Sequence, residues 1–139
     1  MSRLCDLSLD EVTDGIRNQQ FSAEDYVSHI LERIARLDGD IKAFVSVNAD
    51  HAVESARRID SKIRRGEKVG YLAGITVGIK DNISTKGLRT TCASRVLADY
   101  VPPYDATVIR KLKESDAIVI GKLKSDEFAM GSTTEFSNF

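Results

Sequence analysis

The stretch Gly74-Ile75-Thr76-Val77-Gly78-Ile79-Lys80-Asp81-Asn82 decides how the rest of the chain is organised. Its branched apolar side chains alternate as in a half-buried strand, and its two glycines allow close approach of another backbone or a substrate. Side chains on a strand point alternately to opposite faces, so Lys80 and Asp81 point apart. The stretch therefore predicts a strand with a lysine at its carboxyl end that its acidic neighbour does not neutralise.

Two interpretations of Lys80 follow from this position. A lysine acts as a general base only when it is neutral, which requires a pKa about three units below the usual value of ~10.4. An apolar, desolvated pocket can lower the pKa by that amount. Alternatively, the aliphatic stem covers the core while the ammonium group reaches water. Residue type alone favours the second interpretation, because most lysines beside a strand are of that kind.

The composition is that of a globular domain. The chain has 139 residues, of which 42% are apolar and 29% charged, and 20 basic against 21 acidic residues leave a net charge of −1. Overall charge therefore indicates neither nucleic-acid nor anionic-membrane binding. Residues 1–6 lack the apolar segment of a signal peptide, and no apolar run reaches the ~18 residues of a membrane span. We predict a cytoplasmic protein that does not contact a membrane.

The cysteines and histidines indicate neither a disulfide nor a metal site. Cys5 and Cys92 lie far apart and form no C-x-x-C pair, so reduced thiols are favoured. His29 and His51 fall within helical patterns and lack metal-ligand spacing, so surface or packing roles are favoured for both.

Capping signals and apolar spacing predict the helices. N-terminal caps followed by helical apolar periodicity indicate helices over residues 8–18, 22–38 and 48–65, the second ending at Asp38-Gly39-Asp40. Basic residues gather near the C-terminal end of the third helix, where the helix dipole favours them, so a solvated face is favoured over an RNA site. Asp105 is the predicted N-cap of a further helix.

Strands are predicted at residues 41–47 and 117–120, in addition to the strand that ends at Lys80. The last of these is a continuous apolar run closed by Gly121. The order of strand, helix-containing connection and strand favours parallel pairing with helices covering the sheet. The sequence thus predicts an α/β fold with N-terminal helices followed by βαβ-type units.

The C-terminal residues 125–139 are rich in hydroxyl groups, with Gly131 near their centre, which is typical of a loop that lines a site. Asp126 and Glu127 are adjacent and would diverge on a helix or strand. We therefore do not favour them as a catalytic acid and base pair.

Four segments in the same order resemble motifs of the amidase signature family: residues 74–83, 90–94, 100–108 and 126–132. The likeness extends over nearly the whole chain, although the first forty residues contribute only a matching helix pattern. It implies that residues 1–139 form the N-terminal part of an amidase signature domain, with a larger mixed sheet than this chain alone contains.

Family members hydrolyse glutamine or small amides with a serine nucleophile, a second serine in a cis peptide, and a lysine. The resemblance implies that Lys80 is this catalytic lysine, and it reverses the preference stated above. Neutral Lys80 would take a proton from the bridging serine, which would activate the nucleophile. Met130, Gly131 and Ser132 match a segment that lines the family's substrate pocket. Both family serines lie in Gly/Ser-rich segments C-terminal to this chain, so we expect the chain alone not to hydrolyse glutamine.

The resemblance further implies a glutaminase subunit in tRNA-dependent amidation. Ammonia from glutamine would pass to a B subunit, which uses ATP and Mg²⁺ to amidate mischarged Glu-tRNA(Gln) or Asp-tRNA(Asn), and a small C subunit would brace the pair. No cofactor is expected in this chain itself. Two alternatives stay open: a stand-alone amidase of the same family, and a non-catalytic truncated or split fragment.

Three places depart from the family pattern. Thr76 stands where proline is common, Asp116 where glycine is usual, and Leu123-Lys124-Ser125 where Thr-Asn-Met is typical. We expect the turn before the last strand to tolerate Asp116. The third departure adjoins the C-terminal loop and weakens the assignment of the substrate pocket.

Overall fold

The computed structural model describes residues 4–139, so residues 1–3 of the N-terminal segment lie outside the description. Three short 3-10 turns accompany the regular elements, at Leu4–Asp6 (η1), Arg95–Leu97 (η2) and Glu127–Ala129 (η3). The regular elements are α1 (Leu9–Arg17), α2 (Ala23–Ile41), β1 (Phe44–Val47), α3 (Ala49–Arg64), β2 (Thr76–Lys80), α4 (Thr107–Glu114) and β3 (Ile118–Leu123). None of the helices in this described part is long and apolar enough to cross a membrane.

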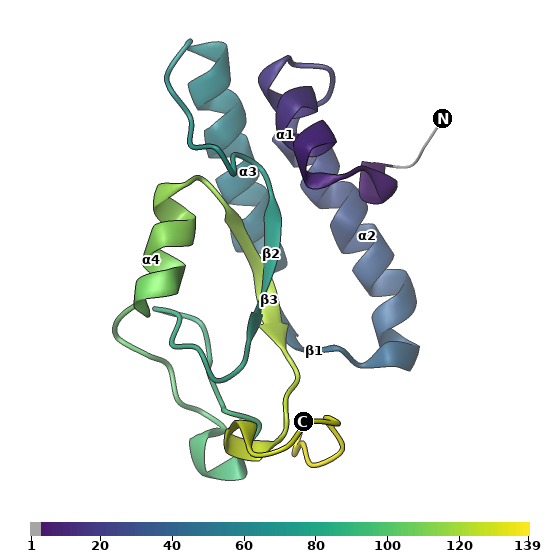
Figure 1. Cartoon of the computed structure of the whole chain (residues 1–139), viewed down its shortest axis with the longest axis vertical. Helices are drawn as coiled ribbons and strands as arrows, with labels where there is room; N and C mark the ends of the chain where they lie inside the picture. The colour runs from purple at the N-terminus through teal and green to yellow at the C-terminus, as the bar shows by residue number, and fades with distance from the viewer. Residues whose placement is uncertain (1–3) are drawn as a thin grey trace.

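The three strands form one mixed sheet with the order β1-β3-β2. β3 pairs antiparallel with β1 and parallel with β2, which confirms the predicted parallel pairing. Ile118 and Ile120 pack into a core with α1, α2 and α3, whereas Val119 packs with Ile109 of α4. Helices therefore cover both faces of β3, and Figure 1 shows α4 on one side of the sheet and α2 on the other. The α/β prediction is confirmed.

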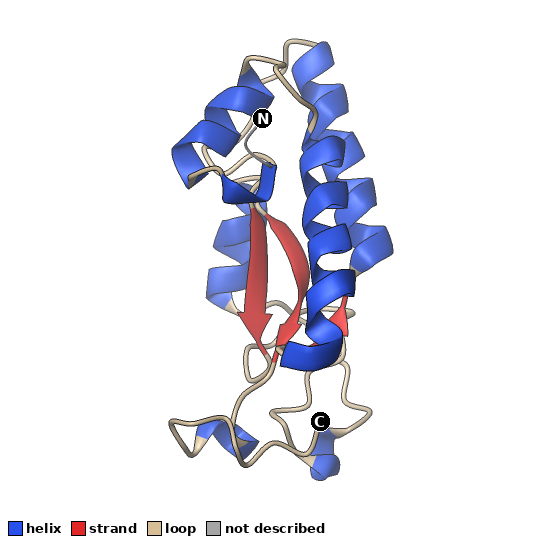
Figure 2. Cartoon of the chain, turned by 90° about the vertical axis from the view of Figure 1, so that its right-hand side faces the viewer, coloured by secondary structure: helices blue, strands red, loops and turns tan. Residues whose placement is uncertain are grey.

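The carboxyl ends of the parallel strands β2 and β3 lie at the same end of the molecule. In Figure 2 their arrowheads point toward loops and short turns, which include the C-terminal residues. Open α/β sheets bind ligands at the carboxyl ends of their strands. A functional site is therefore expected at this end of the sheet.

The predicted helix starts are confirmed at α1 and α2. The Ser8 hydroxyl accepts from the Glu11 backbone N–H, and the Glu11 carboxylate accepts from the Ser8 backbone N–H at 2.7 Å. The Ser22 hydroxyl and Asp25 form the same reciprocal pair at the start of α2. Such pairs satisfy backbone N–H groups that would otherwise lack partners.

The predicted end of α2 is wrong. The helix continues through Gly39 to Ile41, and Lys42 takes the left-handed conformation at φ +54° that ends it. The Asp38 carboxylate does not stop the helix but accepts from the backbone N–H of Ala43 at 2.7 Å, just beyond the helix. The first strand consequently begins at Phe44 rather than at residue 41.

Asp105 is not the N-cap of α4, because Ala106 occupies that position. One Asp105 carboxylate oxygen instead accepts from the Lys86 backbone N–H at 2.7 Å, and the other from the Lys113 ammonium group at 2.7 Å. The side chain thus joins the turn at residues 85–88 to α4. The preference of aspartate for helix caps cannot distinguish a carboxylate that caps a helix from one that joins two separate segments.

The last strand does not end at Gly121 but continues to Leu123. Gly121 is needed inside the sheet, since a Cβ atom there would lie 2.4 Å from the carbonyl oxygen of Ser46 on β1. The pairing of β2 with β3 changes register between Val77 and Gly78, so β3 has one extra residue opposite this step. A bulge of this kind redirects the side chains that follow it.

Asp116 adopts φ +60°, which explains why glycine suits this turn. Its carboxylate accepts from the Gly70 backbone N–H at 2.7 Å and from the Lys62 ammonium group at 2.8 Å. These bonds tie the turn before β3 to α3 and to the segment before β2. The aspartate therefore offsets an unfavourable backbone conformation with contacts that glycine could not make.

We predict that Asp116→Ala destabilises the chain by about 2 kcal/mol, because it keeps the positive φ and removes the acceptor of the Gly70 N–H. Asp116→Gly should cost about 1 kcal/mol less than Asp116→Ala, because glycine adopts positive φ without strain. Urea unfolding at neutral pH measures both. Equal stabilities for the alanine variant and the parent chain would contradict this role of Asp116.

Candidate functional site

Lys80 is the last residue of β2 and pairs with Leu123 of β3. Ile79 before it is buried, whereas Lys80 itself is exposed. The apolar niche expected around a catalytic lysine is therefore not formed by residues 4–139, and the placement is that of a lysine whose ammonium group reaches water. The strand exposes Lys80 because the alternation of side chains that buries Ile79 points its neighbour outward.

Asp81 lies on the other side of the chain and is fully buried. Its carboxylate accepts from the Thr91 backbone N–H at 3.1 Å, from the Thr91 hydroxyl, and from the Ala93 backbone N–H at 3.4 Å. Its own backbone N–H donates to Leu123, and its carbonyl accepts from Cys92. A buried carboxylate requires such partners. Asp81 thus fixes the segment after Lys80 against both β3 and residues 91–93.

The loop at residues 91–93 is held in an unusual conformation. Cys92 and Ala93 have φ values of +52° and +56°, which side-chain-bearing residues seldom adopt. The carbonyl oxygens of these two residues accept from the backbone N–H groups of Phe128 and Asn138, respectively. Strained backbone of this kind persists only where surrounding contacts determine it. The loop therefore connects Asp81 to the C-terminal residues.

Cys5 and Cys92 are free thiols in the structure. Cys92 is partly buried within the site loop, and burial raises the pKa of its thiol, with the Asp81 carboxylate acting in the same direction. A raised pKa lowers the thiolate fraction and hence the reactivity of the sulfur. In this environment the Cys92 thiol is therefore a poor nucleophile.

Asp126 organises the C-terminal loop. Its carboxylate accepts from the backbone N–H groups of Phe136 at 3.0 Å and Thr134 at 3.1 Å. The hydrogen bond from Phe136 is the largest cause that lowers the pKa of Asp126, and the positive charge of Lys80 acts in the same direction. The carboxylate is therefore committed to the loop and to a nearby cation. This arrangement agrees with our reluctance to pair Asp126 with Glu127 in acid–base chemistry.

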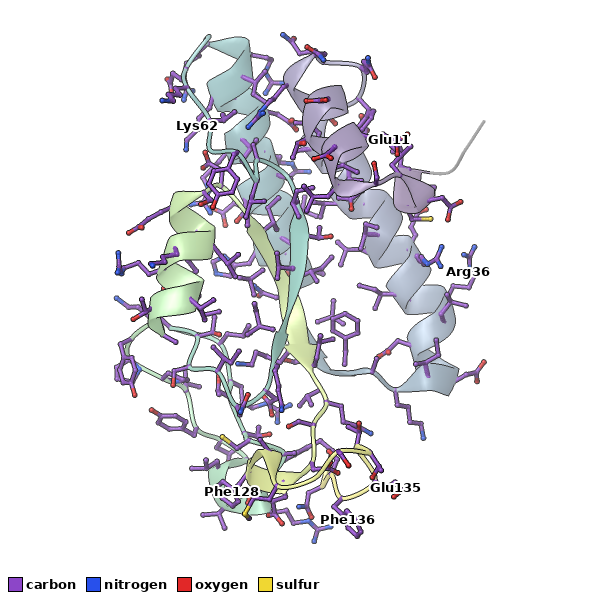
Figure 3. The ribbon with its side chains drawn as sticks, viewed as in Figure 1. Glu11, Arg36, Lys62, Phe128, Glu135 and Phe136 are labelled. Carbon is purple, nitrogen blue, oxygen red and sulfur yellow. The ribbon has the colours of Figure 1, made fainter. Side chains whose placement is uncertain are left out.

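The predicted pocket residues Met130, Gly131 and Ser132 are all exposed in the loop that surrounds Asp126. A Cβ atom on Gly131 would lie 2.3 Å from the Asp126 carboxylate, so only glycine allows the loop to pass so close. Figure 3 shows Phe128 and Phe136 of this loop at the same end of the molecule. The fold thus brings Lys80 and the 130–132 segment near one carboxylate, that of Asp126.

Ser125 lies in a segment that departs from the family pattern. It is buried, and its hydroxyl has no hydrogen-bond partner among residues 4–139; the only other such side-chain oxygen in that part belongs to Ser46. Burying an unpartnered hydroxyl costs free energy. Ser125 therefore leaves an unpaired hydroxyl in the interior beside the C-terminal loop.

Sequence reasoning missed a second lysine, Lys122, which is fully buried on β3. Its ammonium group donates to the carbonyl of Ile83 at 2.5 Å, the hydroxyl of Thr90 at 3.0 Å and the hydroxyl of Thr85 at 3.4 Å. The cause is the bulge in β3, which directs the side chain toward the segment after Lys80. The sequence signal that could have revealed Lys122 was that the strand beginning with the apolar run can continue past Gly121.

Desolvation lowers the pKa of Lys122 to about 8, while the nearby Asp81 carboxylate acts in the opposite direction. Burial thus makes Lys122 less basic, although the hydrogen bonds of its ammonium group show that the side chain has a structural role. Lys122 and Asp81 together hold the chain on either side of the loop that follows Lys80.

The lowered pKa of Lys122 predicts a pH dependence of stability. Because the pKa is about 8 in the folded chain and near 10.5 when unfolded, the unfolded state binds more protons between these values. The contribution of Lys122 to the free energy of unfolding should therefore be constant below the window and rise with pH across it, by about 3 kcal/mol.

Chemical unfolding on either side of this window measures the effect. Cys92 contributes a slope of opposite sign, because burial raises its pKa. Because the charge of Lys122 also acts on the Cys92 thiol, the relevant quantity is the difference between Cys92→Ala and Cys92→Ala/Lys122→Met, two proteins that both lack the Cys92 contribution. The same pH slope in both proteins would show that Lys122 is not desolvated as described.

Comparison with known proteins places this geometry in a family. The protein-family model described as Amidase matches residues 25–139. The A subunit of glutamyl-tRNA(Gln) amidotransferase from Moorella thermoacetica is 49% identical over 133 residues, which cover 96% of this chain and 27% of that protein.

Solved structures of amidase-type proteins resemble this chain as well. The chain is similar to the crystal structure of the A subunit of glutamyl-tRNA(Gln) amidotransferase from Thermotoga maritima, with a TM-score of 0.73 and 39% identity over 100% of this chain and 27% of that one. It is also similar to the peptide amidase of Stenotrophomonas maltophilia, with a TM-score of 0.82 and 28% identity over 88% of this chain and 26% of that one. The chain therefore spans about a quarter of the length of these relatives.

The family match extends over most of the chain and includes β2 with Lys80, the 91–93 loop and the C-terminal loop. These are the segments that Asp81 and Asp126 hold together at the carboxyl ends of the parallel strands. The chain belongs to the amidase signature family.

Proposed function

We propose that this chain is the N-terminal part of the glutamine-hydrolysing subunit of a tRNA-dependent amidotransferase. The similarity to amidotransferase A subunits along 96% of the chain supports this function. The observation that carries the proposal is that Asp81, directly after Lys80, holds the 91–93 loop, whose carbonyl oxygens in turn bind the C-terminal residues around Met130, Gly131 and Ser132. A basic residue and a small polar loop thus share one end of the sheet.

In the proposed reaction, Lys80 in its neutral form takes a proton from a bridging serine, and that serine activates the nucleophilic serine. Both hydroxyls belong to segments of the longer family domain. The exposure of Lys80 supports the proposal that the two serines come from other segments, since an exposed side chain at a strand end is accessible to segments that pack on it. Those segments would also supply the desolvation that a neutral lysine requires.

The proposed role of the 130–132 segment is to contact the amide substrate. Gly131 gives the loop a close approach to Asp126, and the Ser132 hydroxyl is exposed. Small residues and hydroxyls suit recognition of a polar amide, which needs donors and acceptors without bulk. Glutamine is the substrate that similarity to the amidotransferase relatives favours for this proposal.

The proposal extends to the complex. Ammonia from glutamine would serve a B subunit that uses ATP and Mg²⁺ to amidate Glu-tRNA(Gln) or Asp-tRNA(Asn), and a C subunit would complete a cytoplasmic heterotrimer. Such an assembly would act as a ligase in protein biosynthesis. The names of the amidotransferase relatives support this assignment.

A stand-alone amidase is the second candidate, favoured by the structural similarity to the Stenotrophomonas maltophilia peptide amidase. Affinity capture of the longer protein from its own cells distinguishes the two. Recovery of B and C subunits supports the amidotransferase, whereas recovery of the protein alone, together with hydrolysis of simple amides, supports the stand-alone enzyme.

We predict that Lys80→Met lowers glutamine hydrolysis by about 10²–10⁴-fold in the longer protein that carries the family serines, because a general base is removed. Ammonia release under saturating glutamine is the measurement. Lys68→Met is the matched control, since Lys68 is also exposed but precedes β2 and lies away from the site end. Full activity of Lys80→Met would refute the catalytic assignment.

We also predict that the purified 139-residue chain releases no ammonia from glutamine. Its sequence has no pair of adjacent glycines and no G-x-S-x-G elbow, so it lacks the Gly/Ser-rich segments of the family. Incubation with glutamine at high protein concentration provides the test. Turnover that disappears in Lys80→Met would mean that these 139 residues contain their own nucleophile.

A further inference from the structure

A basic pocket of about 550 Å³ lies away from the site at the strand ends. α3, the turn at residues 85–88, the end of α4 and the start of β3 form its walls. Its cationic side chains come from three of these elements and are Arg58, Lys62, Lys86 and Lys113, with His51 beside them. Asp116 is the only acidic side chain in the lining. Asp105 lies just outside the lining and pairs with Lys113, so four cations against two carboxylates leave an excess of two positive charges.

Two of the four cations already have carboxylate partners. Lys62 pairs with Asp116 at 2.8 Å, and Lys113 pairs with Asp105 at 2.7 Å. These pairs fix the positions of α3 and α4 at the edge of the pocket. They account for the two lysines without any ligand.

Arg58 and Lys86 form no direct ion pair with a carboxylate among residues 4–139, although the charge of Lys86 acts on the Asp105 carboxylate that pairs with Lys113. The Arg58 guanidinium group donates to the Ser55 hydroxyl at 2.9 Å, which fixes its position without neutralising it. The Lys86 backbone N–H donates to Asp105, which fixes the turn that carries the Lys86 side chain. The pocket therefore presents two cationic side chains that form no direct ion pair with a protein carboxylate, and both remain available to a bound anion.

The helix dipole does not explain these two charges. Basic residues are favoured in the last turn of a helix, and that position is occupied in α3 by Lys62 and Arg64 and in α4 by Lys111 and Lys113. Arg58 lies earlier in α3, and Lys86 lies on a turn. A single free surface cation is common, but two cations from separate segments facing one cavity indicate an anion site.

The remainder of the lining sets the size and shape of the ligand. Ile59, Leu88 and Val119 provide an apolar surface, and Asn48 and Ser55 add polar groups at the same cavity. A volume of about 550 Å³ lies in the range of small-molecule sites, ~300–1,000 Å³, and far exceeds the volume of a phosphate ion. We propose that the basic pocket binds a small phosphomonoester with an apolar or aromatic body, the size of a nucleoside monophosphate.

In this proposal Arg58 and Lys86 contact the phosphate, because a guanidinium group provides paired donors and an ammonium group a point charge for phosphate oxygens. The apolar wall contacts the body of the ligand. Neither Lys80 nor the 130–132 loop lines this pocket, so the proposal does not depend on the amidase function.

Isothermal titration calorimetry of the 139-residue chain at low ionic strength tests the proposal with adenosine 5′-monophosphate and adenosine as probes. We expect saturable binding of the monophosphate at one site, and at least about tenfold weaker binding of adenosine. The double variant Arg58→Gln/Lys86→Gln should bind the monophosphate about tenfold more weakly, or weaker still. Inorganic phosphate should compete for the site, because it offers the same oxygens to both cations.

Arg36→Gln/Lys68→Gln is the matched control, because it removes two exposed positive charges outside the pocket lining. Its affinity for the monophosphate should stay within about twofold of that of the parent chain. Equal losses in the two double variants would overturn the proposal, because net charge rather than the pocket would then govern binding. Absence of saturable monophosphate binding, or equal affinity for adenosine, would also overturn it.

Arg58 and Lys86 are exposed, so their replacement should leave the fold intact, and circular dichroism melting checks this. Lys86→Gln alone, on a surface turn, provides a second variant should the double variant melt early. NMR then identifies the site independently. The Gly87 amide should shift on addition of the monophosphate, and an unshifted Gly87 with shifts elsewhere would reject the pocket.

Discussion

The buried carboxylate of Asp81 is the constraint on which the site end of this structure depends. A carboxylate removed from water must be fully hydrogen-bonded, and here its donors are the backbone of Thr91 and Ala93 and the Thr91 hydroxyl. The same 91–93 loop has left-handed backbone at Cys92 and Ala93, and its carbonyl oxygens bind the C-terminal residues. The position of Lys80, one residue earlier, is a consequence of the same anchor.

Two lysines on neighbouring strands show how much a single bulge decides. Lys80 ends β2 and is exposed, whereas Lys122 on β3 is buried and holds the segment after β2 through Ile83, Thr85 and Thr90. The ammonium group whose pKa desolvation lowers is thus one with a structural role. A perturbed pKa often marks a functional site, but buried structural networks perturb pKa values as well.

Local charge distribution departs from the overall balance. A net charge of −1 gives no indication of anion binding, yet four cations surround one cavity. On α3, the cations divide by orientation: Arg57 pairs with Glu24, whereas Arg58 and Lys62 face the cavity. Neighbouring helical residues point about 100° apart, so a run of basic residues serves different surfaces.

Local sequence was enough to predict the capped helices, the strand that ends at Lys80, the parallel βαβ order and the family. These depend on periodicity, on cap chemistry and on motifs, all of which are contiguous in the chain. Three-dimensional packing was needed to establish that α2 passes Gly39, that Asp105 bridges to Lys86 and Lys113, and that Lys122 is buried while Lys80 is exposed. The physical reason is that a carboxylate or ammonium group takes whichever partners the fold brings near, and a one-residue bulge exchanges the two faces of a strand.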